Sequence, residues 1–89
     1  MTMKQRIEAR LTEGLAPIAL EVLDESDRHK GHSGARAGGE THYRVDIVAD
    51  RFAGKGKVER HRMVYGLLKE EFAAGVHALA LKTLAPGEV

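Results

Sequence analysis

Hydrophobic residues near the start of the chain recur at the spacing of one face of an α-helix. They stand four residues apart, at Met3, Ile7, Leu11 and Leu15. Thr2 and Gln5 have the residue types and the spacing of a capping box, which satisfies free backbone N–H groups at the start of a helix. Glycine commonly follows the last helical residue. The pattern therefore predicts a helix over about residues 3–13 that ends at Gly14.

Alternation of hydrophobic and polar residues predicts three strands. The first covers residues 18–25 and the last covers residues 75–84. The second covers residues 41–49 and alternates most regularly. Its inward residues are Tyr43, Val45 and Ile47, and its outward residues are His42, Arg44 and Asp46. Such alternation is typical of a strand with one buried face.

The remaining segments predict a second helix and its connections. Residues 57–73 carry a stripe at a spacing near 3.5, made of Val58, His61, Val64, Tyr65, Leu68 and Phe72. Residues 26–40 and 51–57 contain several glycines and polar residues, which predict a long loop and a turn. Residues 86–89 are expected to form a flexible tail.

Together these elements predict one α+β domain over residues 1–89. The order is helix, strand, strand, helix, strand, and the two strands that flank the long loop are expected to pair antiparallel. Each helix stripe needs an apolar surface against which to pack, and the sheet offers one on its hydrophobic face. The expected architecture therefore has two layers, with helices covering a three-stranded sheet.

Composition narrows the possible functions. The chain has 89 residues and a formal net charge of +1, which does not suggest a protein that coats nucleic acid. It has no cysteine, so a metal must take His, Asp or Glu ligands here, or thiolates from another molecule. No apolar run reaches the length of about 18 residues that predicts a membrane helix. The start of the chain lacks the apolar core of a secretion signal, so the expected location is the cytoplasm.

Five histidines are the candidate ligands: His29, His32, His42, His61 and His77. His29 and His32 lie three residues apart in the glycine-rich loop, where they are either solvated or available to a metal. His42 falls on the polar face of its strand, which indicates exposure to solvent, and His61 lies in a helix stripe, which indicates packing. His77 opens the hydrophobic face of the last strand, either as a satisfied residue at the core edge or as a ligand for a partner.

Nucleic-acid binding has more support than enzymatic activity, because the sequence shows no motif for a catalytic nucleophile with its base. Five basic residues between positions 51 and 62 oppose a single acid, Glu59. They are Arg51, Lys55, Lys57, Arg60 and Arg62. Basic side chains and backbone N–H groups at a helix start suit phosphate. Aromatic residues make up only 4% of the chain, which leaves few side chains for stacking on bases.

Three stretches together resemble the BolA-like protein family. They are GETHYRVDIVADRF (39–52), GKGKVERHRMVYGLLKEEF (54–72) and GVHALALKTLAP (75–86). The preceding LEVLDESDRHKGHSGAR (20–36) resembles the bacterial branch that carries histidines in this loop. The resemblance covers nearly the whole chain. It implies a BolA fold, similar to class II KH domains, with the order αββααβ, a three-stranded mixed sheet, and the additional helix as a short turn within residues 51–57.

The resemblance also implies an adaptor rather than an enzyme. BolA-like proteins are associated with monothiol glutaredoxins, with which they form a heterodimer around a shared 2Fe–2S cluster in iron homeostasis. The family's histidine before the last strand matches His77, and the second ligand best matches His29, with His32 as the alternate. The glutaredoxin and glutathione would supply the thiolates. The isolated protein is expected to be a monomer without a cofactor.

The second activity implied by the resemblance is DNA binding and transcriptional regulation. The basic residues between positions 51 and 62 would form its surface. No membrane partner is expected. A cluster adaptor and a DNA binder are different classes of protein, and one chain can serve as both.

Overall fold

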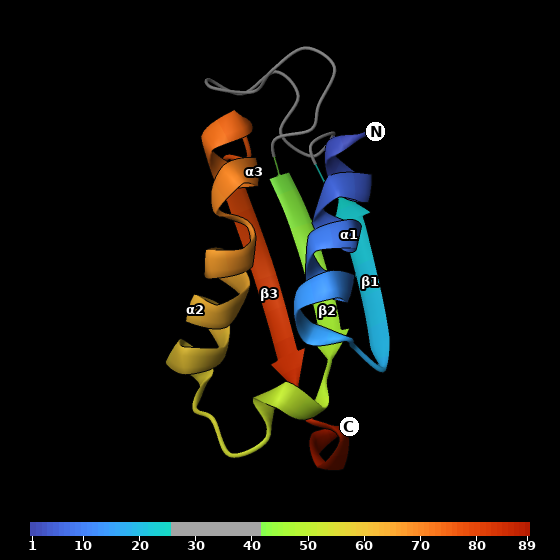
Figure 1. The fold of residues 1–89 in the computed structure, drawn as a ribbon, viewed down its shortest axis with the longest axis vertical. Coiled ribbons are helices and arrows are strands. Elements are labelled where there is room, and N and C mark those ends of the chain that lie inside the picture. The colour runs from blue at the N-terminus through green and yellow to red at the C-terminus, as the bar shows by residue number, and fades with distance from the viewer. Residues whose placement is uncertain (26–41) are drawn as a thin grey trace.

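The computed structural model describes residues 1–25 and 42–89. Its elements are α1 (Met3–Leu15), β1 (Ala19–Asp24), β2 (His42–Val48), a 3-10 helix (Asp50–Phe52), α2 (Lys57–Leu67), α3 (Lys69–Ala74), β3 (Ala78–Leu84) and a second 3-10 helix (Pro86–Glu88). The strand order is β1-β2-β3, with β1 antiparallel and β3 parallel to β2. The predicted order αββααβ and the mixed sheet are therefore confirmed (Figure 1). The additional helix expected within residues 51–57 is instead α3, and residues 50–52 form only a 3-10 helix.

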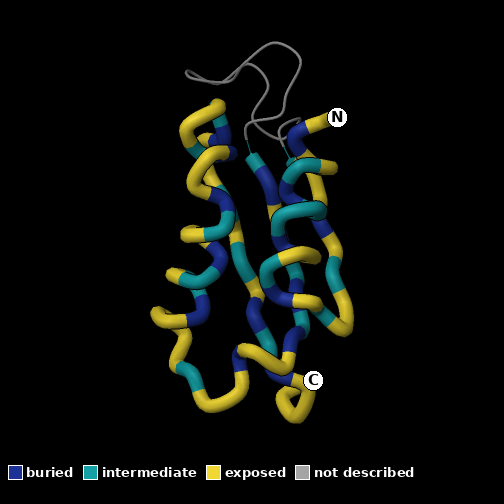
Figure 2. The backbone as a smooth tube through the Cα atoms, in the orientation of Figure 1, coloured by how far each residue is buried: buried dark blue, intermediate teal, exposed yellow. Residues whose placement is uncertain are grey.

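The domain has two layers, and its core lies between them. The helices lie over one face of the sheet, with α1 in contact with β1 and α2 in contact with β3. Buried residues line the inner sides of both layers (Figure 2). The inward residues predicted for β2, namely Tyr43, Val45 and Ile47, are all buried. Phe52 from the first 3-10 helix is also fully buried and completes one end of this core.

Helix α1 begins as predicted but ends later. The Thr2 hydroxyl accepts a hydrogen bond from the Gln5 N–H at 3.1 Å, and the Gln5 side chain accepts one from the Thr2 N–H at 2.9 Å, which confirms the capping box. The four predicted stripe residues are buried. The prediction that Gly14 ends the helix is wrong, because the helix continues to the next residue and Ala16 caps it at φ 44°. A Cβ on Gly14 would lie 2.5 Å from the Leu67 side chain, so glycine here permits the close approach of α1 and α2.

The single helix predicted over residues 57–73 is instead two helices. α2 ends at Leu67 and α3 begins at Lys69, with Leu68 between them at φ −102° and ψ 15°. Gly66 lies just before the break, and glycine lowers helix stability by about 1 kcal/mol relative to alanine. Leu68 is 1% exposed. The low helix propensity of Gly66 and the burial of Leu68 in the core account for the break between α2 and α3.

The buried face of α2 differs from the expected stripe. Val64 and Leu68 are buried, but Val58 is 66% exposed and Tyr65 is 41% exposed, so the expected stripe is wrong at these two positions. The buried face starts at Arg60 and continues at the fourth, seventh and eighth residues after it, which is the spacing of one helix face. The sequence pattern does not predict that this face starts at Arg60, because arginine counts as a polar residue in such a pattern.

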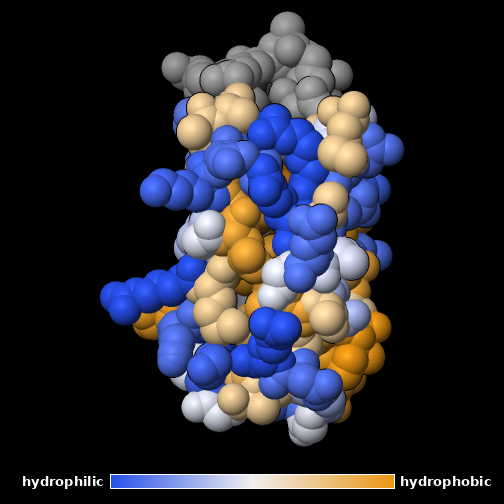
Figure 3. Space-filling view, viewed as in Figure 1, coloured by the Kyte–Doolittle hydropathy of each residue, from blue (hydrophilic) through white to orange (hydrophobic). Residues whose placement is uncertain are grey.

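The molecular surface on the helix side is mixed. Hydrophobic residues are visible in a band between the helices, and strongly hydrophilic residues lie between the facing parts of α3 and α1 (Figure 3). None of the helices within residues 1–25 and 42–89 combines the length and hydropathy of a membrane span.

Candidate functional site

His77 lies just before β3, because the last strand begins at Ala78 and not at residue 75 as predicted. It follows Gly75, whose φ of 130° is a conformation that glycine adopts easily. Val76 is buried, and its N–H donates to the Glu71 carbonyl oxygen at 3.2 Å. His77 itself is exposed. The backbone before His77 is thus anchored to α3, while its imidazole remains accessible.

The His77 imidazole stacks against that of His42. The ring centroids are 5.5 Å apart, and the ring planes make an angle of 23°. His42 is the first residue of β2, stands beside Ala78 in the parallel pairing, and is half-buried. The sequence-based interpretation of His42 as a solvent-exposed residue is therefore corrected. No sequence signal indicated this contact, because it depends on the register between two strands that are far apart in the chain.

His29 and His32, the predicted second ligand and its alternate, lie outside the residues that the structure describes. The described residues on either side of this segment meet near His77. Glu25 donates its backbone N–H to the His42 carbonyl oxygen at 2.8 Å. Both flanks of the undescribed segment therefore lie next to the pair of imidazoles.

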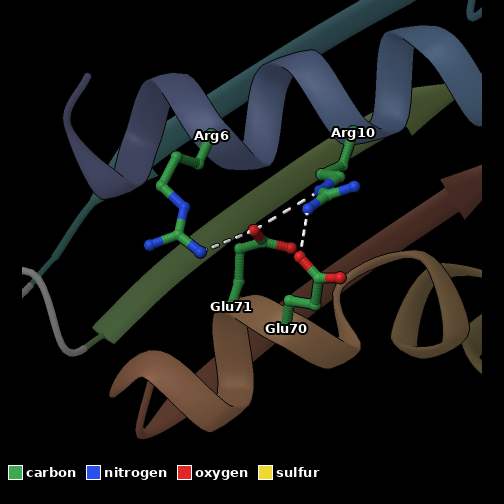
Figure 4. A network of polar contacts seen from close by, with 4 residues as sticks. All are labelled: Arg6, Arg10, Glu70 and Glu71. Carbon is green, nitrogen blue, oxygen red and sulfur yellow. Dashed lines mark hydrogen bonds and ion pairs between the residues drawn. The ribbon is translucent and has the colours of Figure 1, made fainter.

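A charge cluster of Arg6, Arg10, Glu70 and Glu71 joins α1 to α3, the helix that precedes His77. Glu71 is 1% exposed, and its Oε2 accepts from Arg6 at 3.0 Å and from Arg10 at 3.5 Å. Arg10 also pairs with Glu70 (Figure 4). The second Glu71 oxygen is buried and has no hydrogen-bond partner among the described residues. A buried carboxylate is tolerated only with paired charge, so the two arginines stabilise the position of α3.

The two imidazoles have the chemistry of metal ligands but do not form a complete site. Neutral imidazole suits iron, copper and zinc. Within residues 1–25 and 42–89, no group of three or more ligand-type side chains could hold a metal ion. A metal at this end of the domain would therefore need donors from outside the described residues.

The basic residues predicted for nucleic acid lie at the other end of the domain, where β2 ends and α2 begins (Figure 1). Arg51, Lys57 and Arg62 are exposed, and Lys55 is half-buried. Arg60 is 8% exposed. The predicted set is therefore not uniform, and Arg60 differs from the other four.

Arg60 joins three segments of the fold. Its Nε donates to the Lys55 carbonyl oxygen at 2.8 Å, and its Nη1 donates to the Thr83 carbonyl oxygen at 3.1 Å. Both Nη atoms donate to the Glu88 carboxylate, at 2.5 and 2.7 Å. The hydrogen bond from Arg60, with a second from the Ala85 N–H, lowers the pKa of Glu88 to about 2. Arg60 thus holds the C-terminal 3-10 helix, in the segment expected to be a tail, and donates its hydrogen bonds within the fold.

We expect the contact between Arg60 and Glu88 to be lost only in acid. A carboxyl whose pKa falls from 4.5 in the unfolded chain to about 2 in the fold stabilises the fold fully above about pH 4.5. This contribution is lost as the pH falls from 4.5 towards 2, because the unfolded chain takes up the proton first. An NMR titration of the Glu88 carboxyl carbon should have its midpoint near pH 2. A Glu88 midpoint near 4.5 would show that the pair does not form in solution.

His61 belongs to this second end and not to the His77 end. It is half-buried in α2, which agrees with the packing predicted from its place in the helix stripe. It lines a pocket with Lys57, Lys82 and Thr83. Its Nε2 is buried and has no hydrogen-bond partner among the described residues. His61 is therefore separate from the imidazole pair.

Comparisons with known proteins agree on one family. The family model described as BolA-like protein matches residues 11–88. The DNA-binding transcriptional regulator BolA of Escherichia coli (strain K12) is 47% identical over 83 residues, covering 93% of this chain and 75% of that protein. SufE-like protein 1, chloroplastic/mitochondrial, of Arabidopsis thaliana is 44% identical over 88 residues, and the chain spans 94% of its own length but 24% of that protein. The solved BolA domain of SufE1 from Arabidopsis thaliana matches with a TM-score of 0.89 and 43% identity, covering 100% of this chain and 98% of that one.

Proposed function

This chain belongs to the BolA-like protein family, and from that premise we propose that it is an adaptor that shares a 2Fe–2S cluster with a monothiol glutaredoxin. The cluster is the cargo of the heterodimer in iron homeostasis, and the adaptor acts in the cytoplasm and is not an enzyme. His77 provides one ligand. His29 provides the second, with His32 as the alternate.

The accessible imidazole of His77 carries this proposal. Buried polar side chains in folded proteins are generally hydrogen-bonded within the fold. The His77 side chain is exposed, makes no hydrogen bond or ion pair with another described residue, and contacts a second imidazole. Its backbone is held by the buried Val76. Such a side chain is available to a partner and is attached to a rigid base.

The lack of cysteine sets what each partner contributes. In Rieske centres two imidazoles replace two thiolates on one iron, and the reduction potential rises. In the proposed heterodimer this chain supplies the imidazoles, and the glutaredoxin cysteine with glutathione supplies the thiolates. A cluster divided between two proteins in this way suits transfer rather than permanent storage.

Chain connectivity supports His29 as the second ligand. Glu25 is bonded through its backbone to His42, which stacks against His77. His29 follows Glu25 by four residues, and four residues of extended chain span at most about 14 Å. His32 is three residues further along.

Mixing this protein with a monothiol glutaredoxin, iron, sulfide and glutathione tests the proposal. We expect a heterodimer on size-exclusion chromatography whose visible absorption differs from that of the glutaredoxin alone. The control is the same mixture without iron and sulfide. A glutaredoxin spectrum that does not change when this protein is added would reject the proposal.

DNA binding is a second candidate function, favoured by the other end of the domain. The relative from Escherichia coli is named a DNA-binding transcriptional regulator. In this chain Arg51, Lys57 and Arg62 are exposed near the start of α2, and no side chain caps that helix start. Free N–H groups and basic side chains suit phosphate. We infer that this surface, without Arg60, contacts the DNA backbone.

Charge removal on this surface should weaken DNA binding in a salt-dependent way. Each lost phosphate contact reduces the slope of log K against log salt by about 0.9. The double variant Lys57→Gln/Arg62→Gln should therefore bind more weakly with a slope smaller by about 2. Lys4→Gln, an exposed change on α1, is the control. No binding at low salt, or equal slopes for all three proteins, would contradict this function.

A further inference from the structure

His42, the first residue of β2, and His77, the residue just before β3, face each other where two neighbouring parallel strands begin. Their centroid separation of 5.5 Å and interplanar angle of 23° lie within the range of offset-stacked aromatic pairs. His77 is exposed, and among the described residues His42 provides its ring contact. The His42 ring is therefore a contact that can orient the His77 imidazole.

His42 belongs to the central strand of the sheet, which is paired on both edges. Strand β2 lies between β1 and β3, and its first residue is held from both sides. The His42 carbonyl oxygen accepts from the Glu25 N–H at 2.8 Å on one side, and His42 is paired with Ala78 on the other. A side chain on a paired strand fixes the position of a contacting side chain more precisely than a side chain on a loop does.

The stacked arrangement favours support over shared ligation of one ion. The lone pair of an imidazole nitrogen lies in the plane of its ring. Two rings in nearly parallel planes point these lone pairs side by side, and not toward a common point between them. The pair as built therefore offers one ligand, His77, and one ring that orients it.

We propose that His42 is a positioning residue for His77, and that the stacked His42 ring holds the His77 imidazole in the orientation in which it meets the shared cluster. The inference rests on the proposed function, since it concerns the same site. Ordering one side chain on binding typically costs enough to change affinity by about 3- to 10-fold. Stacking against His42 removes part of this cost before the partner arrives.

Two substitutions of His42 separate a positioning role from a ligand role. His42→Ala removes the ring, whereas His42→Phe keeps a flat ring without a nitrogen. Arg44→Ala, an exposed residue on the same face of β2, is the matched control. The measurements are the His77 ring chemical shifts in the protein alone, the dissociation constant of the cluster-bearing heterodimer, and the nitrogen couplings in the electron paramagnetic resonance spectrum of that heterodimer after one-electron reduction of its cluster with dithionite.

We expect His42→Ala to shift the His77 ring resonances and to weaken the cluster-bearing heterodimer by about 3- to 10-fold, with the nitrogen couplings retained. His42→Phe should restore the affinity to within about twofold of the original, and Arg44→Ala should change neither quantity. Loss of a nitrogen coupling in both His42 variants would make His42 a ligand and overturn the proposal. Unchanged shifts and affinity in His42→Ala would overturn it as well.

The proposed function and this inference fail in different ways. If the unaltered protein forms no cluster-bearing heterodimer, the proposed function fails, and the inference fails with it. If that heterodimer forms and loses its cluster in His77→Ala but is unaffected by His42→Ala, only the inference fails.

Discussion

Replacing His77 with alanine is expected to abolish the cluster-bearing heterodimer while the domain remains folded. The side chain is exposed and makes no hydrogen bond within the described residues, so its loss should change the free energy of unfolding by less than about 0.5 kcal/mol. Loss of a metal ligand is far more damaging to the cluster. Loss of a residue that hydrogen-bonds to a metal ligand already lowers metal affinity by about 10- to 100-fold, so loss of a ligand should lower it by more than about 100-fold.

Visible and circular dichroism spectra of the reconstituted mixture measure this effect. His61→Ala, at the other end of the domain, controls for the loss of an imidazole as such. His29→Ala and His32→Ala identify which loop histidine is the second ligand. If both His77→Ala and His29→Ala give the same cluster spectrum and cluster stability as the unaltered protein, the ligand assignment is ruled out.

Replacing Arg6 with methionine is expected to destabilise the fold by about 3 kcal/mol. The Arg6 side chain is 35% exposed, whereas Glu71 is 1% exposed, so the arginine can be hydrated when unpaired and the carboxylate cannot. Breaking a buried pair by removal of one partner typically costs about 3–5 kcal/mol. Arg10 remains near Glu71 at 3.5 Å, which places the expected loss at the low end.

The double variant Arg6→Met/Glu71→Leu is the test of this explanation. Removal of the buried carboxylate should restore most of the stability, because replacement of a buried ion pair by apolar residues is often nearly neutral. Urea unfolding of the single and double variants gives the comparison. A double variant less stable than Arg6→Met would show that the Glu71 carboxylate stabilises α3 without Arg6.

Local patterns in the sequence determined most of the secondary structure and the family. The capping box and stripe of α1 and the inward residues of β2 were correct, because burial on one face imposes a period of about 3.6 or 2 within a single segment. The motifs around residues 39–86 identified the BolA-like family, which the comparisons confirm. His77 is a candidate ligand from a single segment as well, because the alternation of that segment places an imidazole on the hydrophobic face.

Only the tertiary structure decided how distant segments meet. Gly14 lies within its helix and leaves room for the Leu67 side chain, and Arg60 is buried because Glu88 and two carbonyl oxygens satisfy its guanidinium. The stack of His42 on His77 exists because β2 and β3 pair in parallel in one register. Periodicity within a segment shows which of its residues face the core, but it does not show which residues of another segment they contact. Partners are set when the segments pack, and the contacts that orient the candidate ligand are of that kind.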